Sequence, residues 1–368
     1  MARRIRKQLE LRLGEPVGIV VPWVYGDDQL RILREEASEE PNLWHRVFLS
    51  PELGDVIRPL LFSGEGFNDE LSTFLRIYKK QKKRLEDLLK FSLRTIDLNG
   101  EDLRFESGSI QLEVTRNPVV STGVEFSYYS SVSYCSAIFE ELLQHEEVAG
   151  INYELVAKAV LDVREIEADF RLHFQPFPRC LSFKKNSQPL FETEQETPPL
   201  ISLPKVPKEN LERGVYVSVS GIPGVSSLYK EALRLPQTIF TNDRSRGLVK
   251  GQVYSPQYIA HPSVDQVFAR AAWNTIWLAN LTGTPLVCPD HMQGDHPEIL
   301  FNLKSISKMN LAYIWDSQKT SLAEFLAEVP SGKQKTPEIY EETRKRFGTL
   351  DGLDYCVKII VEDFLHAG

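Results

Sequence analysis

Short apolar runs separated by glycine, proline and polar turns dominate residues 211–368. Residues 215–220 form such a run, which ends at the glycine loop 221–224, and residues 226–235 then have helical spacing. The same pattern predicts further strands at 237–241, 253–259, 264–268 and 284–288, and helices at 274–281 and 353–365. Short apolar strands that alternate with helices are typical of a parallel sheet covered on both faces, so we predict an α/β fold. Such sheets bind ligands at the carboxyl ends of their strands.

The N-terminal half has a weaker pattern of the same kind. It predicts strands at 17–23 and 57–62, a hairpin over 102–114, and helices at 70–91, 138–143 and 153–163. The first of these helices carries the basic segment 79–84 (KKQKKR). Such a segment is ordinarily a solvated face. A peripheral contact with an anionic membrane or an acidic partner is the alternative.

The clearest change of composition lies at residues 184–210, where five prolines stand among charged residues. Because proline cannot donate to a sheet ladder, we interpret this stretch as an interdomain linker. A length of 368 residues is enough for two or three domains. We therefore predict an N-terminal α/β domain at 1–185, with an extension of unassigned role at 1–54. A Pro-rich linker at 186–210 and a C-terminal domain at 211–368 follow.

Charge and motif content exclude several classes of protein. The chain has 43 Lys and Arg against 51 Asp and Glu, a formal net charge of −8, so we expect no nucleic-acid partner. There is no long apolar segment, no apolar core near the start and no close cysteine pair, which favours reduced thiols and a cytoplasmic location. No His/Cys cluster has metal-ligand spacing, and no P-loop or serine-hydrolase motif is present. We therefore predict neither a metal site nor a cofactor.

The stretch with the most chemical information is 258–302. The predicted strand 264–268 leads into a loop of small residues with one cation, Arg270, and a helix follows with Asn274 or Thr275 as its N-cap. A helix N-terminus presents free N–H groups and a positive dipole end, and a guanidinium can hold a phosphate through two hydrogen bonds. This loop is therefore a candidate phosphate site.

The residues around this loop follow a recognisable order. It consists of Arg270-Ala271-Ala272, Trp273-Asn274-Thr275, Gly283-Thr284-Pro285, an apolar strand to Pro289, Asp295-His296-Pro297-Glu298 and Asn302. This order resembles the nucleotide-sugar-binding half of the GT-B glycosyltransferases. The likeness is to the UDP-glycosyltransferases and to the bacterial transferase that adds N-acetylglucosamine to the peptidoglycan lipid precursor. The resemblance covers about residues 211–366 and implies two Rossmann-like domains of GT-B type, with the nucleotide-sugar donor on the C-terminal one.

The resemblance also implies roles for particular residues. The donor diphosphate is expected at Arg270, Ala272, Asn274 and Thr275, and the sugar hydroxyls at Asp295, His296 and Glu298. Gly221 is expected in the opening glycine loop, and Ile259 where the backbone contacts the base. Two positions depart from the family pattern: Ala272 replaces a loop glycine, and Leu278 stands where an acid usually holds the ribose.

Fewer features of the sequence indicate the catalytic residues. An inverting transferase needs a general base beside the acceptor hydroxyl, and the candidate carboxylates on predicted N-terminal loops are Glu65 and Glu125. We expect metal-independent transfer of a sugar from a nucleotide diphosphate-sugar, with a UDP-sugar as the first choice. The acceptor class is open and includes lipid-linked acceptors. The alternative is a catalytically silent relative that acts as a binding or partner subunit, and an epimerase or hydrolase on the same fold is a third reading.

Overall fold

The computed structural model describes residues 1–39, 46–61, 66–106, 108–116, 122–145, 148–184, 188–219, 225–242 and 251–367. The N-terminal half consists of α1 (Ala2–Leu13), β1 (Ile19–Pro22), α2 (Asp27–Glu39), β2 (Val47–Ser50), α4 (Pro51–Leu61), α5 (Phe67–Lys90), β3 (Ser92–Asp97), β4 (Asp102–Glu106), β5 (Leu112–Thr115), β6 (Phe126–Ser130), α6 (Cys135–Leu143), α7 (Tyr153–Ala168), β7 (Leu172–Pro176) and β8 (Glu194–Thr197). The C-terminal half consists of β9 (Gly214–Ser218), α8 (Val225–Ala232), β10 (Thr238–Thr241), β11 (Gln252–Val253), the 3₁₀ helix η2 (Pro256–Ala260), β12 (Val264–Ala269), α9 (Trp273–Leu281), β13 (Leu286–Pro289), α10 (Pro297–Lys308), β14 (Tyr313–Trp315), α11 (Leu322–Glu328), α12 (Glu338–Phe347) and α13 (Gly352–Ala367).

The C-terminal sheet is parallel throughout and has the strand order β11-β10-β9-β12-β13-β14. In chain order this is 3-2-1-4-5-6, the doubly wound arrangement, so the α/β prediction for this half is confirmed. The order reverses between β9 and β12, where the chain leaves one side of the sheet and returns on the other. A crevice at the carboxyl ends of these two strands is where a ligand binds in such a sheet.

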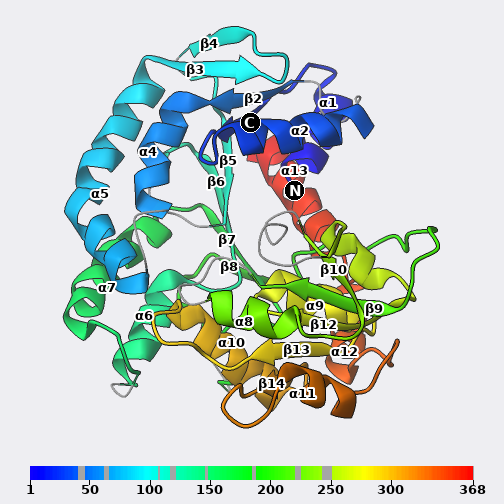
Figure 1. Cartoon of the computed structure of the whole chain (residues 1–368). Coiled ribbons are helices and arrows are strands. Elements are labelled where there is room, and N and C mark those ends of the chain that lie inside the picture. Colours follow the sequence, from blue (N-terminus) through cyan, green and yellow to red (C-terminus); the bar gives the residue numbers. More distant parts are fainter. Residues whose placement is uncertain are drawn as a thin grey trace.

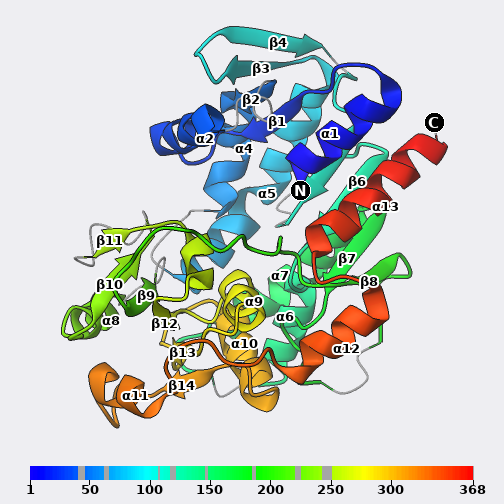
Figure 2. The ribbon, with the colours of Figure 1, turned by 90° about the vertical axis from the view of Figure 1, so that its right-hand side faces the viewer.

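The N-terminal half contains two separate sheets. The strands β5-β6-β7-β8 are all parallel, whereas β1-β2-β3-β4 has one parallel pair followed by antiparallel pairs. In Figure 1 the N-terminal elements (blue to cyan) lie above the C-terminal sheet (green to orange). The helix α13 (red) runs back to lie beside α1. Seen from the side in Figure 2, α13 extends along β6 and β7, where Asp363 accepts a hydrogen bond from the Tyr128 hydroxyl at 2.7 Å.

Three predictions of local structure are wrong. Residues 57–61 are part of the helix α4, because Leu53, Val56 and Leu60 are buried at helical spacing and Ser50 Oγ accepts the Leu53 N–H. The predicted hairpin over 102–114 is instead β3 with β4, and β5 belongs to the other sheet. Most of the strand predicted at 253–259 is the 3₁₀ helix η2.

The predicted linker 186–210 also needs correction. Residues 194–197 form β8, which pairs in parallel with β7 at the edge of its sheet. An edge strand pairs on one side only, and Pro198 and Pro199 follow the strand rather than interrupt it, so the prolines do not prevent pairing. The described residues 201–213 form neither helix nor strand. The domain boundaries themselves stay a prediction.

Candidate functional site

The site is built where β9 and β12 end side by side. Ser218 and Ala269 are register partners at the carboxyl ends of these strands, and Arg270 follows directly. The predicted loop residue Gly221 lies outside the described residues, as does Glu65. The site can therefore be described from the loops that follow β12 and β13.

Arg270 is paired with a buried carboxylate rather than free. Its guanidinium makes two contacts with Asp295, with Nε 3.2 Å from Oδ2 and Nη2 bonded to Oδ1, and Asp295 is 2% exposed. Asp295 also accepts the His296 N–H at 2.7 Å. Burial lowers the pKa of Arg270 to about 10, although Glu298 and Glu70 nearby oppose the shift. A phosphate that approached Arg270 would compete with Asp295.

The helix α9 begins earlier than predicted, so the N-cap prediction is wrong. The N-cap is Ala272, and Asn274 and Thr275 lie within the first turn. Ala272 has no side-chain acceptor, which leaves the helix start without a side-chain cap. Its φ of −99° is ordinary for any residue, so the alanine in place of a glycine causes no strain. The helix start therefore stays suited to an anion, while Asn274 is exposed beside it.

The start of α10 lies against this loop. His296 is its N-cap, where Nδ1 accepts the Glu298 N–H at 3.1 Å. Asn302 is fully buried and donates to the Ala271 carbonyl at 2.7 Å and to Glu298 Oε1 at 3.2 Å. Burial and Arg270 lower the pKa of His296 more than Glu298 raises it, which favours the neutral imidazole. The structure thus brings Arg270, Asp295, His296 and Glu298 together, and the roles that the resemblance implies for them stay predictions.

The two tryptophans at the start of α9 are packing residues. Trp273 donates its indole N–H to Asn302 Oδ1 at 2.6 Å, and Trp277 donates to the Pro178 carbonyl at 2.8 Å. Both rings are buried. The Pro178 contact also joins α9 to the N-terminal half of the chain.

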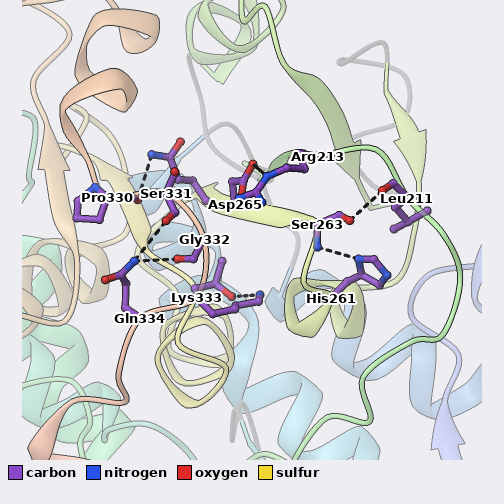
Figure 3. Close-up of polar contacts among 12 residues, drawn as sticks. Leu211, Arg213, His261, Ser263, Asp265, Pro330, Ser331, Gly332, Lys333 and Gln334 are labelled. Atoms are coloured by element: carbon purple, nitrogen blue, oxygen red, sulfur yellow. Dashed lines mark hydrogen bonds and ion pairs between the residues drawn. The ribbon is translucent and has the colours of Figure 1, made fainter.

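Ile259 lies away from this cluster. Its carbonyl accepts from Thr284 Oγ1 at 2.9 Å and from Lys333 Nζ at 2.6 Å, and burial lowers the pKa of Lys333 to about 8. Thr284 precedes β13, so Ile259 lies near the amino edge of the sheet, roughly 15 Å of strand from Arg270. Figure 3 shows Lys333 with other polar contacts at this edge, among them Arg213 with Asp265. The carbonyl of Ile259 is therefore already bonded, at the edge of the sheet opposite to Arg270.

Glu125 is also remote. It precedes β6, which runs parallel to β5, and Arg116 follows β5 at the opposite edge of that sheet. Arg116 contacts Asn274 of the donor-site candidates, with Nη2 3.1 Å from Oδ1. Glu125 instead lines two adjacent cavities of about 520 and 500 Å³ at the amino edge. Its position argues against a role as the base.

Two residues close to this cluster were missed by the sequence interpretation. Glu70, in the first turn of α5, is half-buried and close enough to Arg270 to affect its pKa, while its own pKa is raised by burial. One turn earlier, the ring of Phe67 meets the His296 ring edge-on at 5.2 Å between centroids. The second missed residue is Arg116. In the sequence, Glu70 and Arg116 were ordinary charged residues, and only the packing of the two halves brings them close to this cluster.

Among the described residues, no group of three or more His, Cys, Asp or Glu side chains is arranged to hold a metal ion. No helix within the described ranges is both long and apolar enough to cross a membrane.

Comparisons with known proteins identify the fold. No protein-family model matches the chain, and no curated protein matches it. Among solved structures, it is similar to CalG4, the calicheamicin glycosyltransferase (TM-score 0.54, 13% identity, 99% of this chain and 94% of that chain). It is also similar to Arabidopsis thaliana UGT89C1 complexed with UDP (TM-score 0.53, 12% identity, 98% of this chain and 95% of that chain). A third similar structure is the glycosyltransferase SnogD from Streptomyces nogalater (TM-score 0.52, 12% identity, 98% of this chain and 95% of that chain).

The chain has the GT-B fold, with two Rossmann-like halves. The resemblance seen in the sequence is therefore confirmed at the level of fold.

Proposed function

We propose that the chain is a glycosyltransferase that moves a sugar from a nucleotide diphosphate-sugar to an acceptor hydroxyl. The observation that carries this proposal is the convergence of charged and polar side chains from both halves at the switch point of the C-terminal sheet. Arg116 and Glu70 come from the N-terminal half, and Arg270, His296 and Glu298 from the C-terminal half. A UDP-sugar is the first donor to test, because the similar structure UGT89C1 was solved with UDP and with UDP-L-rhamnose.

The proposed reaction is a direct displacement at the anomeric carbon. The acceptor oxygen forms the new bond as its proton passes to a carboxylate, and the bond between the anomeric carbon and the diphosphate oxygen breaks with its electron pair. The uncapped start of α9 and the cations beside it would stabilise the charge on the departing diphosphate without a metal. The acceptor would enter from the N-terminal half, and lipid-linked acceptors stay among the candidates.

We propose Glu70 as the general base in place of Glu65 and Glu125. Its side chain is half-buried in the first turn of α5, one turn from Phe67, whose ring contacts His296, and it is close enough to Arg270 for each charge to affect the pKa of the other. A raised pKa makes a carboxylate a stronger base at neutral pH.

The test is the release of UDP from a panel of UDP-sugars, with water as the acceptor. We expect Glu70→Gln to lower the rate roughly 10²–10⁴-fold while donor binding is retained. Glu125→Gln, at the far edge of the sheet, is the matched control and should keep the wild-type rate. Equal rates for the wild type and Glu70→Gln would contradict the assignment of the base.

The alternative is a silent GT-B relative. It is favoured by Leu278, which is buried on α9 where a ribose-binding acid is expected, and by the engagement of Arg270 with Asp295. This alternative predicts no release of UDP from any UDP-sugar, with or without nucleotide binding, so the same assay distinguishes the two functions.

A further inference from the structure

The start of α9 receives a cation from the other half of the molecule. Arg116 follows β5 at the carboxyl end of the N-terminal parallel sheet, and its Nη2 donates to Asn274 Oδ1 at 3.1 Å. Asn274 is in the first turn of α9, the helix whose start has no side-chain cap. The guanidinium therefore contacts the first turn of a helix whose N-terminal N–H groups receive no side-chain cap.

The charge of Arg116 is less compensated than that of Arg270. Among the ion pairs of the described residues, Arg270 is joined to Asp295, whereas Arg116 is in none and contacts a neutral amide. The side chain of Arg116 is exposed as a whole, yet its guanidinium is partly desolvated by the surrounding protein, which lowers its pKa. The nearby carboxylate of Glu298 opposes this shift. A cation with a neutral partner at a helix start is well placed to receive an anion.

The two arginines would differ in what they lose on binding a phosphate. Arg270 would have to leave Asp295, which is buried and would then be an unpaired charge, and that exchange is strongly unfavourable. Arg116 would give up only a bond to an exposed amide, which water can replace. A guanidinium also matches two phosphate oxygens at once.

We propose that Arg116, rather than Arg270, is the arginine that binds the diphosphate of the donor. This inference rests on the proposed function and deepens it. Because Arg116 belongs to the N-terminal half and α9 to the C-terminal half, a diphosphate held by both joins the two halves. Arg270 then acts as a positioning residue, which holds the loop between β12 and α9 through Asp295.

Titrations of UDP, inorganic pyrophosphate and uridine into the full chain test this inference. Arg116→Ala should weaken the binding of UDP and of pyrophosphate about 10- to 100-fold and leave the affinity for uridine unchanged, because only the first two carry a diphosphate. Arg116→Lys keeps the positive charge without the planar guanidinium, so its affinity for UDP and pyrophosphate should lie between those of the wild type and of Arg116→Ala. Arg104→Ala, which removes an exposed arginine on β4 that contacts Ser92, is the matched control and should bind like the wild type.

The outcomes separate the two proposals. If the wild type binds UDP and Arg116→Ala binds it equally well, the role of Arg116 is overturned and the proposed function stands. A parallel loss of uridine affinity in Arg116→Ala would mean a structural role and would also overturn it. If the wild type binds neither pyrophosphate nor any of UDP, dTDP and GDP, both proposals fail.

Discussion

Arg270 lies where the sequence places it, but its pairing with Asp295 was not predicted. The sequence placed it after the fourth predicted strand of a parallel sheet, and it follows β12 at the carboxyl edge of such a sheet. Its partner Asp295 is 25 residues further on, after the next strand, and no local pattern indicates that the two would form a buried pair. Substitution of Arg270 would leave Asp295 buried without its partner, so such a variant would report on folding as well as on ligand binding.

Glu167 is a second buried charge whose role is visible only in the structure. It is 0% exposed on α7, and its carboxylate accepts the Cys135 N–H at 2.6 Å, the Ser136 N–H at 3.3 Å and the Ser136 hydroxyl. The N-cap of α6 is Tyr134, which makes no side-chain capping bond, so Glu167 replaces that cap from a neighbouring helix. Burial nevertheless raises its pKa to about 7.

This raised pKa predicts how stability changes with pH. Between about pH 4.5 and 7, the folded chain holds a proton on Glu167 that the unfolded chain has lost, so the free energy of unfolding falls as the pH rises. The effect is about 3 kcal/mol at full extent. Glu167→Gln removes this titration, and the difference between wild type and variant isolates it, since the buried His173 is common to both. Denaturant unfolding at pH 4 and pH 8 is the measurement, and a difference that does not change with pH would contradict this account.

At the scale of elements, the structure gives the N-terminal extension a partner. The helix α1 packs against α13, and Arg4 bonds to Asp351 at 3.0 Å, to Asp354 at 2.7 Å and to Ser202 at 2.5 Å. These contacts tie the start of the chain to its last helix. That helix in turn continues along the N-terminal sheet (Figure 2).

Arg4→Ala should loosen α1 without unfolding the molecule. The ion pairs are partly exposed, so we expect a loss of about 1 kcal/mol, or roughly fivefold faster exchange of the α1 amide hydrogens. Lys7→Ala, an exposed position on the same helix, is the control. Faster exchange in both variants, or in neither, would mean that these ion pairs do not hold the helix.

The elements best predicted from the sequence are those whose apolar runs are bounded by glycine or proline. The strands β9, β10, β12 and β13 were each placed within two residues, because each is buried on both faces and has no polar alternation to misread. The apolar run at 57–61 is short enough to suit either a strand or a helix, and packing of α4 against α5 decides for the helix. The strand β8 has the polar sequence EQET at a sheet edge, and its pairing with β7 leaves no apolar signal.

At the scale of the whole molecule, the candidate site brings together residues that are far apart in the chain. Arg116 and Asn274 are 158 residues apart, and Glu70 and Arg270 are 200 positions apart. The motif order of the sequence could therefore indicate which C-terminal residues lie together. It could not predict which N-terminal side chains lie close to these residues, because this depends on how the two halves pack.

The central claim is that the candidate site around the start of α9 binds a nucleoside diphosphate. Calorimetric titration of the wild-type chain with UDP, dTDP and GDP tests it most directly. At 100 times its dissociation constant a ligand adds about 2.7 kcal/mol of stability, so a thermal shift should accompany the heat of binding. We predict saturable binding of one nucleotide, with UDP as the first choice. The absence of both heat and thermal shift with all three would contradict the account.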